Sequence, residues 1–149
     1  MPPTRPCADT RAGSVLTERI LHAFYAVYNE LGAGFLESVY QQAMVIALTE
    51  LDIGVVAEAS IGVSFRGRSV GTFRADLVVD DAVIVELKAG RALEPAHEAQ
   101  LLNLLRASRY ELGMLLHFGP KPQFRRLVFS NDRKGPQISA DVGDSGNRR

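Results

Sequence analysis

Two apolar runs separated by a short polar turn constrain the fold of this chain more than any other feature. Residues 73–79 and 82–89 are rich in valine, leucine and isoleucine, and two aspartates lie between them. This pattern predicts a β-hairpin with largely buried strands. Charges interrupt both strands, because Asp76 stands in the first and Glu86 and Lys88 stand in the second. Since a buried charge is costly unless it is paired or holds a metal ion, these three side chains need partners.

Two interpretations of the three charged residues follow. In the first, they lie on a solvated face of the sheet and form ordinary surface ion pairs, which is the commoner case for such residues. In the second, Asp76 and Glu86 bind a divalent cation, because Mg²⁺ prefers oxygen ligands and usually takes one or two carboxylates. Lys88 would then place its positive charge beside a phosphate or an attacking water. The residues alone leave both interpretations open.

The order of the motifs along the chain is similar to that of a known family. Residues 34–40 have the sequence Gly-Phe-Leu-Glu-Ser-Val-Tyr, and the acid at position 76 is followed by Glu-Leu-Lys at 86–88. Further matching segments are residues 73–79, 83–89, 97–103, 112–119 and 124–128. In this order, over about residues 16–130, the chain resembles the GxxExxY family of the PD-(D/E)XK nuclease superfamily. The proline of the superfamily name is Ala75 here, at a position that contributes no ligand.

This resemblance implies an α/β fold with a restriction-endonuclease-like α-β-β-β-α-β core, in which helices flank a mixed sheet, plus an extra N-terminal helix. Apolar periodicity predicts the same order of elements. Two predicted helices cover residues 17–31 and 35–51, and a third predicted helix begins at residues 94–95. The other predicted strands cover residues 59–65, 112–118 and 124–130.

The resemblance also implies a divalent-metal-dependent nuclease that hydrolyses phosphodiester bonds in DNA or RNA. Asp76, Glu86 and the main-chain carbonyl of Leu87 would bind Mg²⁺ or Mn²⁺. Lys88 would activate water or stabilise the charge that develops on the phosphate.

Two residues on the predicted helices complete the set of candidate catalytic residues. Glu37, at the start of the second helix, either stabilises the helix dipole or assists at the metal site. Gln100 either orients a water or phosphate or is an exposed helix residue. His97 is a weaker candidate, because a histidine at a helix start is more often a cap or a surface residue. Related nuclease branches carry a tyrosine four residues after the glutamine, where this chain has Leu104.

A second function fits the same fold, because fold alone does not determine function. The domain could be a noncatalytic module that binds nucleic acid or protein, and the formal net charge of zero and the missing tyrosine favour this alternative. Hydrolysis or binding of a small phosphate-containing ligand is a third. The intact set of Asp76, Glu86 and Lys88 favours catalysis.

Length and composition set the remaining expectations. With 149 residues, 46% of them hydrophobic, the chain is expected to form one domain over residues 14–130, between disordered tails at 1–13 and 131–149. The single cysteine, Cys7, and the lack of a long apolar run predict a cytoplasmic protein that does not enter a membrane. Zero net charge argues against strong nonspecific DNA binding. A local basic surface near the C-terminus stays open, and a homodimer is compatible with the sequence.

Overall fold

The computed structural model describes residues 11–134. These residues form three α-helices and five strands in the predicted order, with a 3₁₀ turn at the end. The elements are α1 (Arg11–Leu31), α2 (Glu37–Glu50), β1 (Val55–Phe65), β2 (Arg68–Val79), β3 (Val83–Ala89), α3 (Pro95–Arg106), β4 (Leu112–Phe118), β5 (Pro122–Val128) and η1 (Asn131–Arg133).

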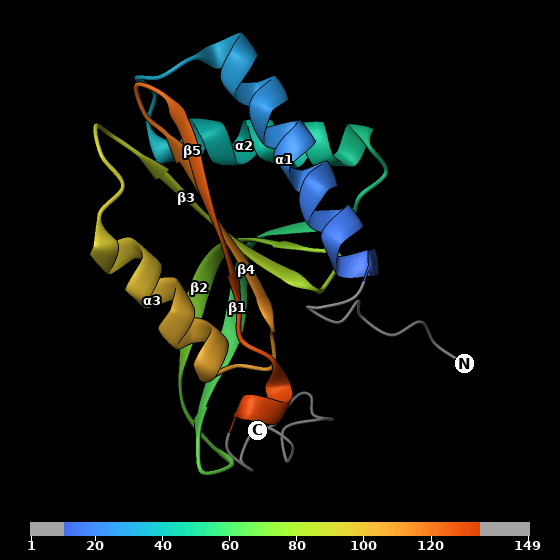
Figure 1. The fold of residues 1–149 in the computed structure, drawn as a ribbon, viewed down its shortest axis with the longest axis vertical. Helices are drawn as coiled ribbons and strands as arrows, with labels where there is room; N and C mark the ends of the chain where they lie inside the picture. The colour runs from blue at the N-terminus through green and yellow to red at the C-terminus, as the bar shows by residue number, and fades with distance from the viewer. Residues whose placement is uncertain (1–10, 135–149) are drawn as a thin grey trace.

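The strands form one mixed sheet in the order β1-β2-β3-β4-β5. Antiparallel pairs join β1 to β2, β2 to β3 and β4 to β5, whereas β3 and β4 are parallel. Helix α3 lies between β3 and β4 in the sequence and makes the crossover that a parallel pair requires (Figure 1). The predicted α/β fold class, a mixed sheet flanked by helices with an extra N-terminal helix, is confirmed.

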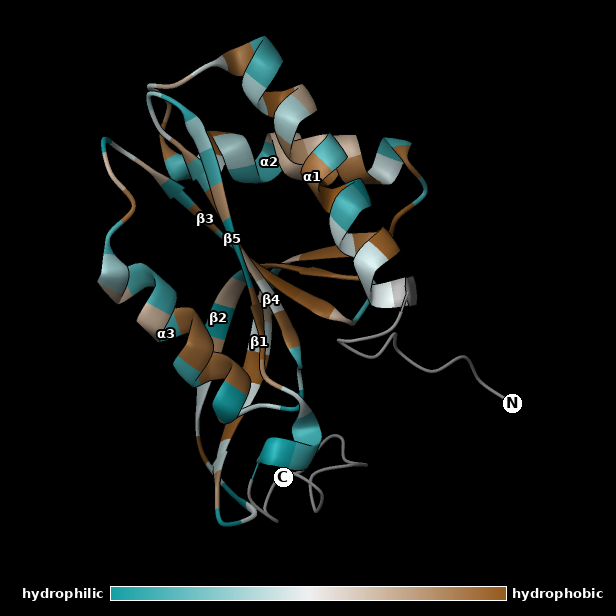
Figure 2. Cartoon of the chain, in the orientation of Figure 1, coloured by the Kyte–Doolittle hydropathy of each residue, from teal (hydrophilic) through white to brown (hydrophobic). Residues whose placement is uncertain are grey.

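Two hydrophobic cores lie on opposite faces of this sheet. Helices α1 and α2 pack on one face, where they bury Val83, Val85 and Leu87 of β3. Helix α3 packs on the other face, over Ile84 of the same strand and Leu115 of β4. All seven residues of β4 are buried, as expected for a strand covered on both sides. Figure 2 shows apolar residues along the strands and polar residues at the turn between β1 and β2.

The largest difference from the predicted elements is at the start of α1. The sequence predicts that this helix begins at Thr17, a residue type that often caps helices, but α1 begins at Arg11. The Thr17 hydroxyl donates instead to the carbonyl of Ser14, 2.9 Å away and one turn earlier in the same helix. A threonine that bonds back into its own helix gives the same sequence signal as a cap.

Described structure continues past both predicted domain boundaries. Residues 11–13 belong to α1, and residues 131–134 follow β5 as η1 and its C-cap. The Lys134 ammonium donates to the carbonyl of Ser108 at 2.9 Å and to that of Tyr110 at 2.7 Å. The rest of both predicted tails, with Cys7, lies outside the described residues. No helix within residues 11–134 has both the length and the apolar character needed to cross a membrane.

Candidate active site

The candidate site lies where strands β2 and β3 separate. Their ladder runs from Val79 and Val83 to Leu77 and Val85 and ends there. Asp76 and Glu86 would form the next pair in this register. Backbone groups beyond the end of a ladder need other hydrogen-bond partners.

Each of the two acids supplies such a partner to the opposite strand. The Leu87 N–H donates to Asp76 Oδ2 at 2.8 Å, and the Asp76 N–H donates to Glu86 Oε2 at 3.3 Å. The two carboxylates thus replace the carbonyl groups of a regular ladder. The structure therefore brings Asp76 and Glu86 together at one opening in the sheet.

Strand β1 is irregular opposite the same opening. Glu58 has a φ of 55°, in the left-handed region that residues other than glycine seldom adopt. Residues two apart in a strand normally share a face, yet Ala57 and Leu77 pack against the α1–α2 core while Ala59 and Ala75 pack against the α3 core. Both strands therefore turn over between these positions, at the level of the Asp76 side chain.

Burial and mutual repulsion make the site electrostatically strained. Glu86 is 8% exposed, and burial, reinforced by the charge of Asp76, raises its pKa to about 8. Burial also raises the pKa of Asp76, although the hydrogen bond from the Leu87 N–H opposes this shift. The nearby carboxylates of Glu37 and Glu58 add to the increase in the Asp76 pKa. Burial and repulsion at this opening therefore disfavour the charged forms of both acids.

Lys88 is the cation that interacts with both acids. It is half-buried, two residues after Glu86 on the same strand face, and its charge lowers the pKa of both Asp76 and Glu86. Within the described part of the chain it forms no close ion pair with either carboxylate. The Lys88 ammonium thus influences both carboxylates electrostatically without forming a close ion pair with either.

Glu37 joins the site from the start of α2. It is the first residue of the helix, and its Oε2 accepts the Ala89 N–H at 3.0 Å. This bond connects the end of β3, just after Lys88, to the beginning of α2. Glu37 also lies near enough to Asp76 for its charge to raise the Asp76 pKa, and its assistance at a metal site stays a prediction.

Tyr40, one turn further along α2, fastens the preceding loop. Its hydroxyl donates to the Gly32 carbonyl at 2.6 Å and accepts the Phe35 N–H at 3.2 Å. Its ring stacks on Phe118 with centroids 4.1 Å apart, so it also belongs to the core between the sheet and helices α1 and α2. Gly34 turns the loop with a φ of 111°. Gly34 thus allows the loop to turn, Glu37 links the end of the loop to β3, and the Tyr40 hydroxyl holds the loop backbone.

Replacing Tyr40 by phenylalanine tests this bracing role. Tyr40→Phe keeps the stacked ring but leaves the Gly32 carbonyl and the Phe35 N–H without their partner. We therefore expect the free energy of unfolding to fall by about 1–3 kcal/mol. Thermal unfolding measures the loss, and Tyr25→Phe, at a tyrosine that is 37% exposed, is the matched control. Equal melting temperatures for the two variants would show that the hydroxyl does not hold the loop.

Two residues of the site, Gln41 and Glu58, are not among those predicted from the sequence. Gln41 is 8% exposed, and its Nε2 donates to Glu58 Oε2 at 2.7 Å and to the Asp76 carbonyl at 3.0 Å. Gln41 lies three residues before Met44 and seven before Leu48, on the buried face of α2. A polar residue at this helical spacing among apolar ones could have indicated its role. Glu58 gave no such signal, because its left-handed backbone is not encoded by its residue type.

The two candidates on α3 do not join the opening by hydrogen bonds. Gln100 is exposed, and no hydrogen bond links it to Asp76 or Glu86 in the described structure. His97 accepts the Glu94 N–H at Nδ1, 3.3 Å away, and completes a capping box at the start of the helix. This histidine is thus part of the helix cap, one of the two roles, cap or surface residue, that the sequence favoured for it. Leu104, at the position of the missing tyrosine, is 6% exposed in the α3 core.

Comparison with known proteins gave a match to a solved structure and a match to a family model. No curated protein matches the chain. The solved structure titled "Crystal structure of SSO0001" matches with a TM-score of 0.49 at 16% identity, over 87% of this chain and 64% of that one. The chain thus spans less than two thirds of that protein. A family model described as "PD-(D/E)XK nuclease superfamily" matches residues 14–127, which include α2, the separated strands and the Glu-Leu-Lys segment. With most of its length matched in this way, the chain belongs to the PD-(D/E)XK nuclease superfamily.

Proposed function

We propose that this protein is a divalent-metal-dependent nuclease of the GxxExxY family that hydrolyses phosphodiester bonds in DNA or RNA. The observation that carries the proposal is the opening between β2 and β3, where Asp76 and Glu86 meet beside Lys88. Membership of a nuclease superfamily supports the reaction class. A cytoplasmic setting is part of the proposal, and a homodimer stays a prediction.

The residues at the opening fit a hard divalent cation. The carboxylates of buried Glu86 and half-buried Asp76, both with raised pKa values, are stabilised in their charged forms by a positive charge placed between them. No group of three or more Asp, Glu, His or Cys residues in the part of the chain that the structure describes is arranged to hold a metal ion. Mg²⁺ does not need such a group, because it usually takes one or two carboxylates together with waters and substrate phosphates.

The three ligands supplied by the protein would be Asp76, Glu86 and the main-chain carbonyl of Leu87. The N–H and the C=O of a strand residue point toward the same neighbouring strand. Since the Leu87 N–H bonds to Asp76 across the opening, its carbonyl faces the same opening. Bound Mg²⁺ or Mn²⁺ would offset the charge of a phosphodiester and make a water molecule more acidic.

The side chains around the ligands have separate tasks. Lys88 places a fixed positive charge where negative charge grows on the phosphate. Gln41 holds the backbone of Asp76 through its carbonyl, and Glu37 holds that of Ala89, so both positions are fixed before substrate arrives. Gln100 would act on the substrate from the exposed side of α3.

One set of observations favours the alternative, a noncatalytic binding module. The formal net charge is zero, and several of the C-terminal basic residues have partners within the protein. Arg125 lies 3.6 Å from Glu98, the Arg133 guanidinium lies over the Phe129 ring, and Lys134 binds backbone carbonyls. These residues offer less positive charge to a nucleic acid backbone than their number suggests.

Changing Asp76 to asparagine tests catalysis against binding. Asp76→Asn keeps the shape but removes the charge that a hard cation prefers, so we expect metal-dependent cleavage to be abolished. Purified protein is assayed with Mg²⁺ and with Mn²⁺ on single- and double-stranded DNA and RNA. Asp132→Asn, at an exposed acid in η1, is the matched control. Wild-type protein that cleaves none of these substrates would favour the binding module, and unchanged cleavage by Asp76→Asn would place the activity elsewhere.

A further inference from the structure

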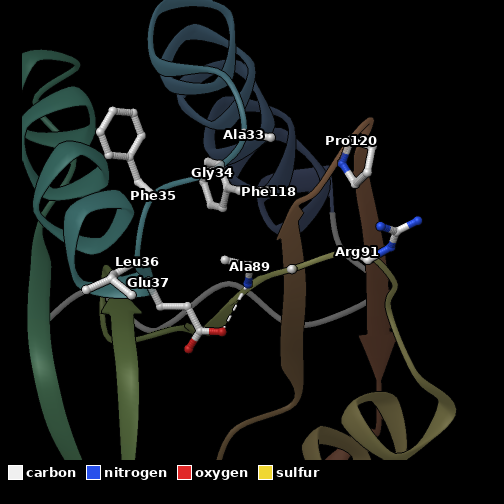
Figure 3. A pocket seen from close by; sticks show the side chains of 10 residues that line it. Ala33, Gly34, Phe35, Leu36, Glu37, Ala89, Arg91, Phe118 and Pro120 are labelled. Atoms are coloured by element: carbon white, nitrogen blue, oxygen red, sulfur yellow. Dashed lines mark hydrogen bonds between the residues drawn. The ribbon is translucent and has the colours of Figure 1, made fainter.

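A pocket of about 590 Å³ lies directly beside the candidate active site. Its walls come from the loop before α2, from the end of β3 and from the turn after β4, and Glu37 and Ala89 belong to both the pocket and the site (Figure 3). Its volume is in the range of pockets that take small molecules. The pocket therefore borders the candidate site at Glu37 and Ala89, and Ala89 directly follows Lys88 in the chain.

The pocket walls are mostly apolar, and the charged residues among them are Glu37 and, at the opposite side, Arg91. Phe35 is 46% exposed and Leu36 is 77% exposed, although both are large apolar side chains. Figure 3 shows these two residues on one side of Ala89 and Arg91 on the other. A flat aromatic ring attached to a phosphate would satisfy both sides, because a base stacks on an aromatic side chain while its backbone pairs with a cation.

Three rings hold the walls in place without any ligand. Tyr40 fastens the loop that carries Phe35, as described above. The Tyr28 hydroxyl donates to the Gly119 carbonyl at 2.7 Å, and His117 Nε2 lies 3.0 Å from the Gly90 carbonyl. Because each wall is tied by a side chain from the fold beneath it, the pocket is preformed, which lowers the entropy lost on binding.

We propose that this pocket receives an unpaired nucleobase of the nucleotide next to the phosphate held at Asp76 and Glu86. The inference rests on the proposed function and specifies its substrate as single-stranded nucleic acid or an unpaired end. A base within a duplex is stacked and paired, and extruding it costs a few kcal/mol. An unpaired base enters without that penalty.

Binding of oligonucleotides that lack single bases tests the proposal. A fluorescent oligothymidylate and a series with one abasic position each are titrated with full-length protein, using anisotropy, in EDTA so that cleavage does not occur. For wild type, we expect one position at which base removal weakens binding about fivefold or more, as stacking of one base predicts. In Phe35→Ala this dependence is expected to disappear.

Two further variants make the result specific. Phe65→Ala is the matched control, because Phe65 is 55% exposed on β1 and does not line the pocket. It is expected to keep the abasic effect. Leu36→Ser, at a more exposed lining residue, is expected to reduce the effect and serves if Phe35→Ala does not fold. Melting curves establish that each variant is folded.

The outcomes separate this inference from the proposed function. Binding without dependence on any single base, an abasic effect that survives in both Phe35→Ala and Leu36→Ser, or tighter binding of a blunt duplex would overturn the pocket assignment while leaving catalysis untouched. Absence of all oligonucleotide binding would overturn it as well, and the cleavage assay decides the enzyme separately. Base-dependent binding in a protein that does not cleave would support the pocket and reject the nuclease.

Discussion

Lys88→Ala is expected to cleave nucleic acid at least about a hundredfold more slowly than wild type and to bind Mn²⁺ as wild type does. A protonated lysine has no lone pair to offer, so it is not a metal ligand. Its charge matters most when charge builds up on the phosphate, which is a transition-state effect. Initial rates measure cleavage, and calorimetric titration with Mn²⁺ measures binding.

The comparison with Glu86→Ala makes this prediction sharper. That variant removes a proposed ligand and is expected to lose both metal binding and cleavage. Because the charge of Lys88 lowers the pKa of Asp76 and of Glu86, its removal moves deprotonation of both acids to higher pH, so Mn²⁺ binding by Lys88→Ala is compared with wild type over a series of pH values. Lys121→Ala, at an exposed lysine after β4, is the matched control.

Two results would contradict the assignment of Lys88. If Lys88→Ala cleaves like Lys121→Ala, the lysine is a surface residue without a catalytic task. If Lys88→Ala instead loses Mn²⁺ binding while its melting curve stays cooperative, the lysine positions the acids and its role is structural.

The metal-free protein is expected to lose stability as the pH rises from about 4.5 to about 8. The folded state keeps the Glu86 proton up to its raised pKa, whereas the unfolded chain releases it near the ordinary value of 4.5. Between these values the folded state binds more protons, so the free energy of unfolding falls with rising pH. The full change amounts to a few kcal/mol, since each pKa unit corresponds to about 1.4 kcal/mol.

Unfolding by urea in EDTA across this pH range measures the effect. Subtracting the Glu86→Gln curve from the wild-type curve isolates the contribution of Glu86, because other titrating groups are common to both proteins. Glu50→Gln, at an exposed acid at the end of α2, is expected to keep the wild-type pH dependence. A wild-type curve parallel to that of Glu86→Gln would show that Glu86 titrates normally.

Divalent cations are expected to change stability in the opposite direction with pH. Ligand carboxylates must be deprotonated to bind a metal, so a fixed concentration of Mn²⁺ should stabilise the folded state more at pH 8 than at pH 5. Stabilisation that is equal at both values, or that persists in Glu86→Ala, would remove the carboxylate pair from the metal site.

The fold could be predicted from the sequence where burial is continuous or strictly periodic. Strand β4 has the predicted bounds and β3 begins one residue later than predicted, because uninterrupted apolar runs bounded by turns leave little choice of structure. The start of α1 was misplaced because Thr17 bonds within the helix, a choice that depends on three-dimensional contacts. The charged residues in the two predicted strands singled out Asp76 and Glu86 but did not indicate that the strands separate there.

The surroundings of the two acids were harder to predict. The placement of Gln41 against Asp76 depends on where α2 crosses the sheet, and that of Glu58 depends on a backbone conformation its residue type does not favour. Gln100 is the opposite case. The family resemblance made it a candidate, but no hydrogen bond connects it to the opening in the described structure. Local patterns indicate which residues need partners, whereas tertiary packing decides which partners they find.

The two carboxylates that replace ladder carbonyls also bear on how this domain can evolve. Because burial raises the pKa of both, neutral replacements such as Glu86→Gln relieve an unfavourable charge and are expected to stabilise the metal-free fold. Most proteins lie only slightly above the stability they need, so a lineage that ceased to use this chemistry would gain from mutations at these positions. Replacing either acid by a neutral residue is thus expected to raise the stability of the metal-free fold. A chain that retains both acids is less stable without metal than its neutral variants would be.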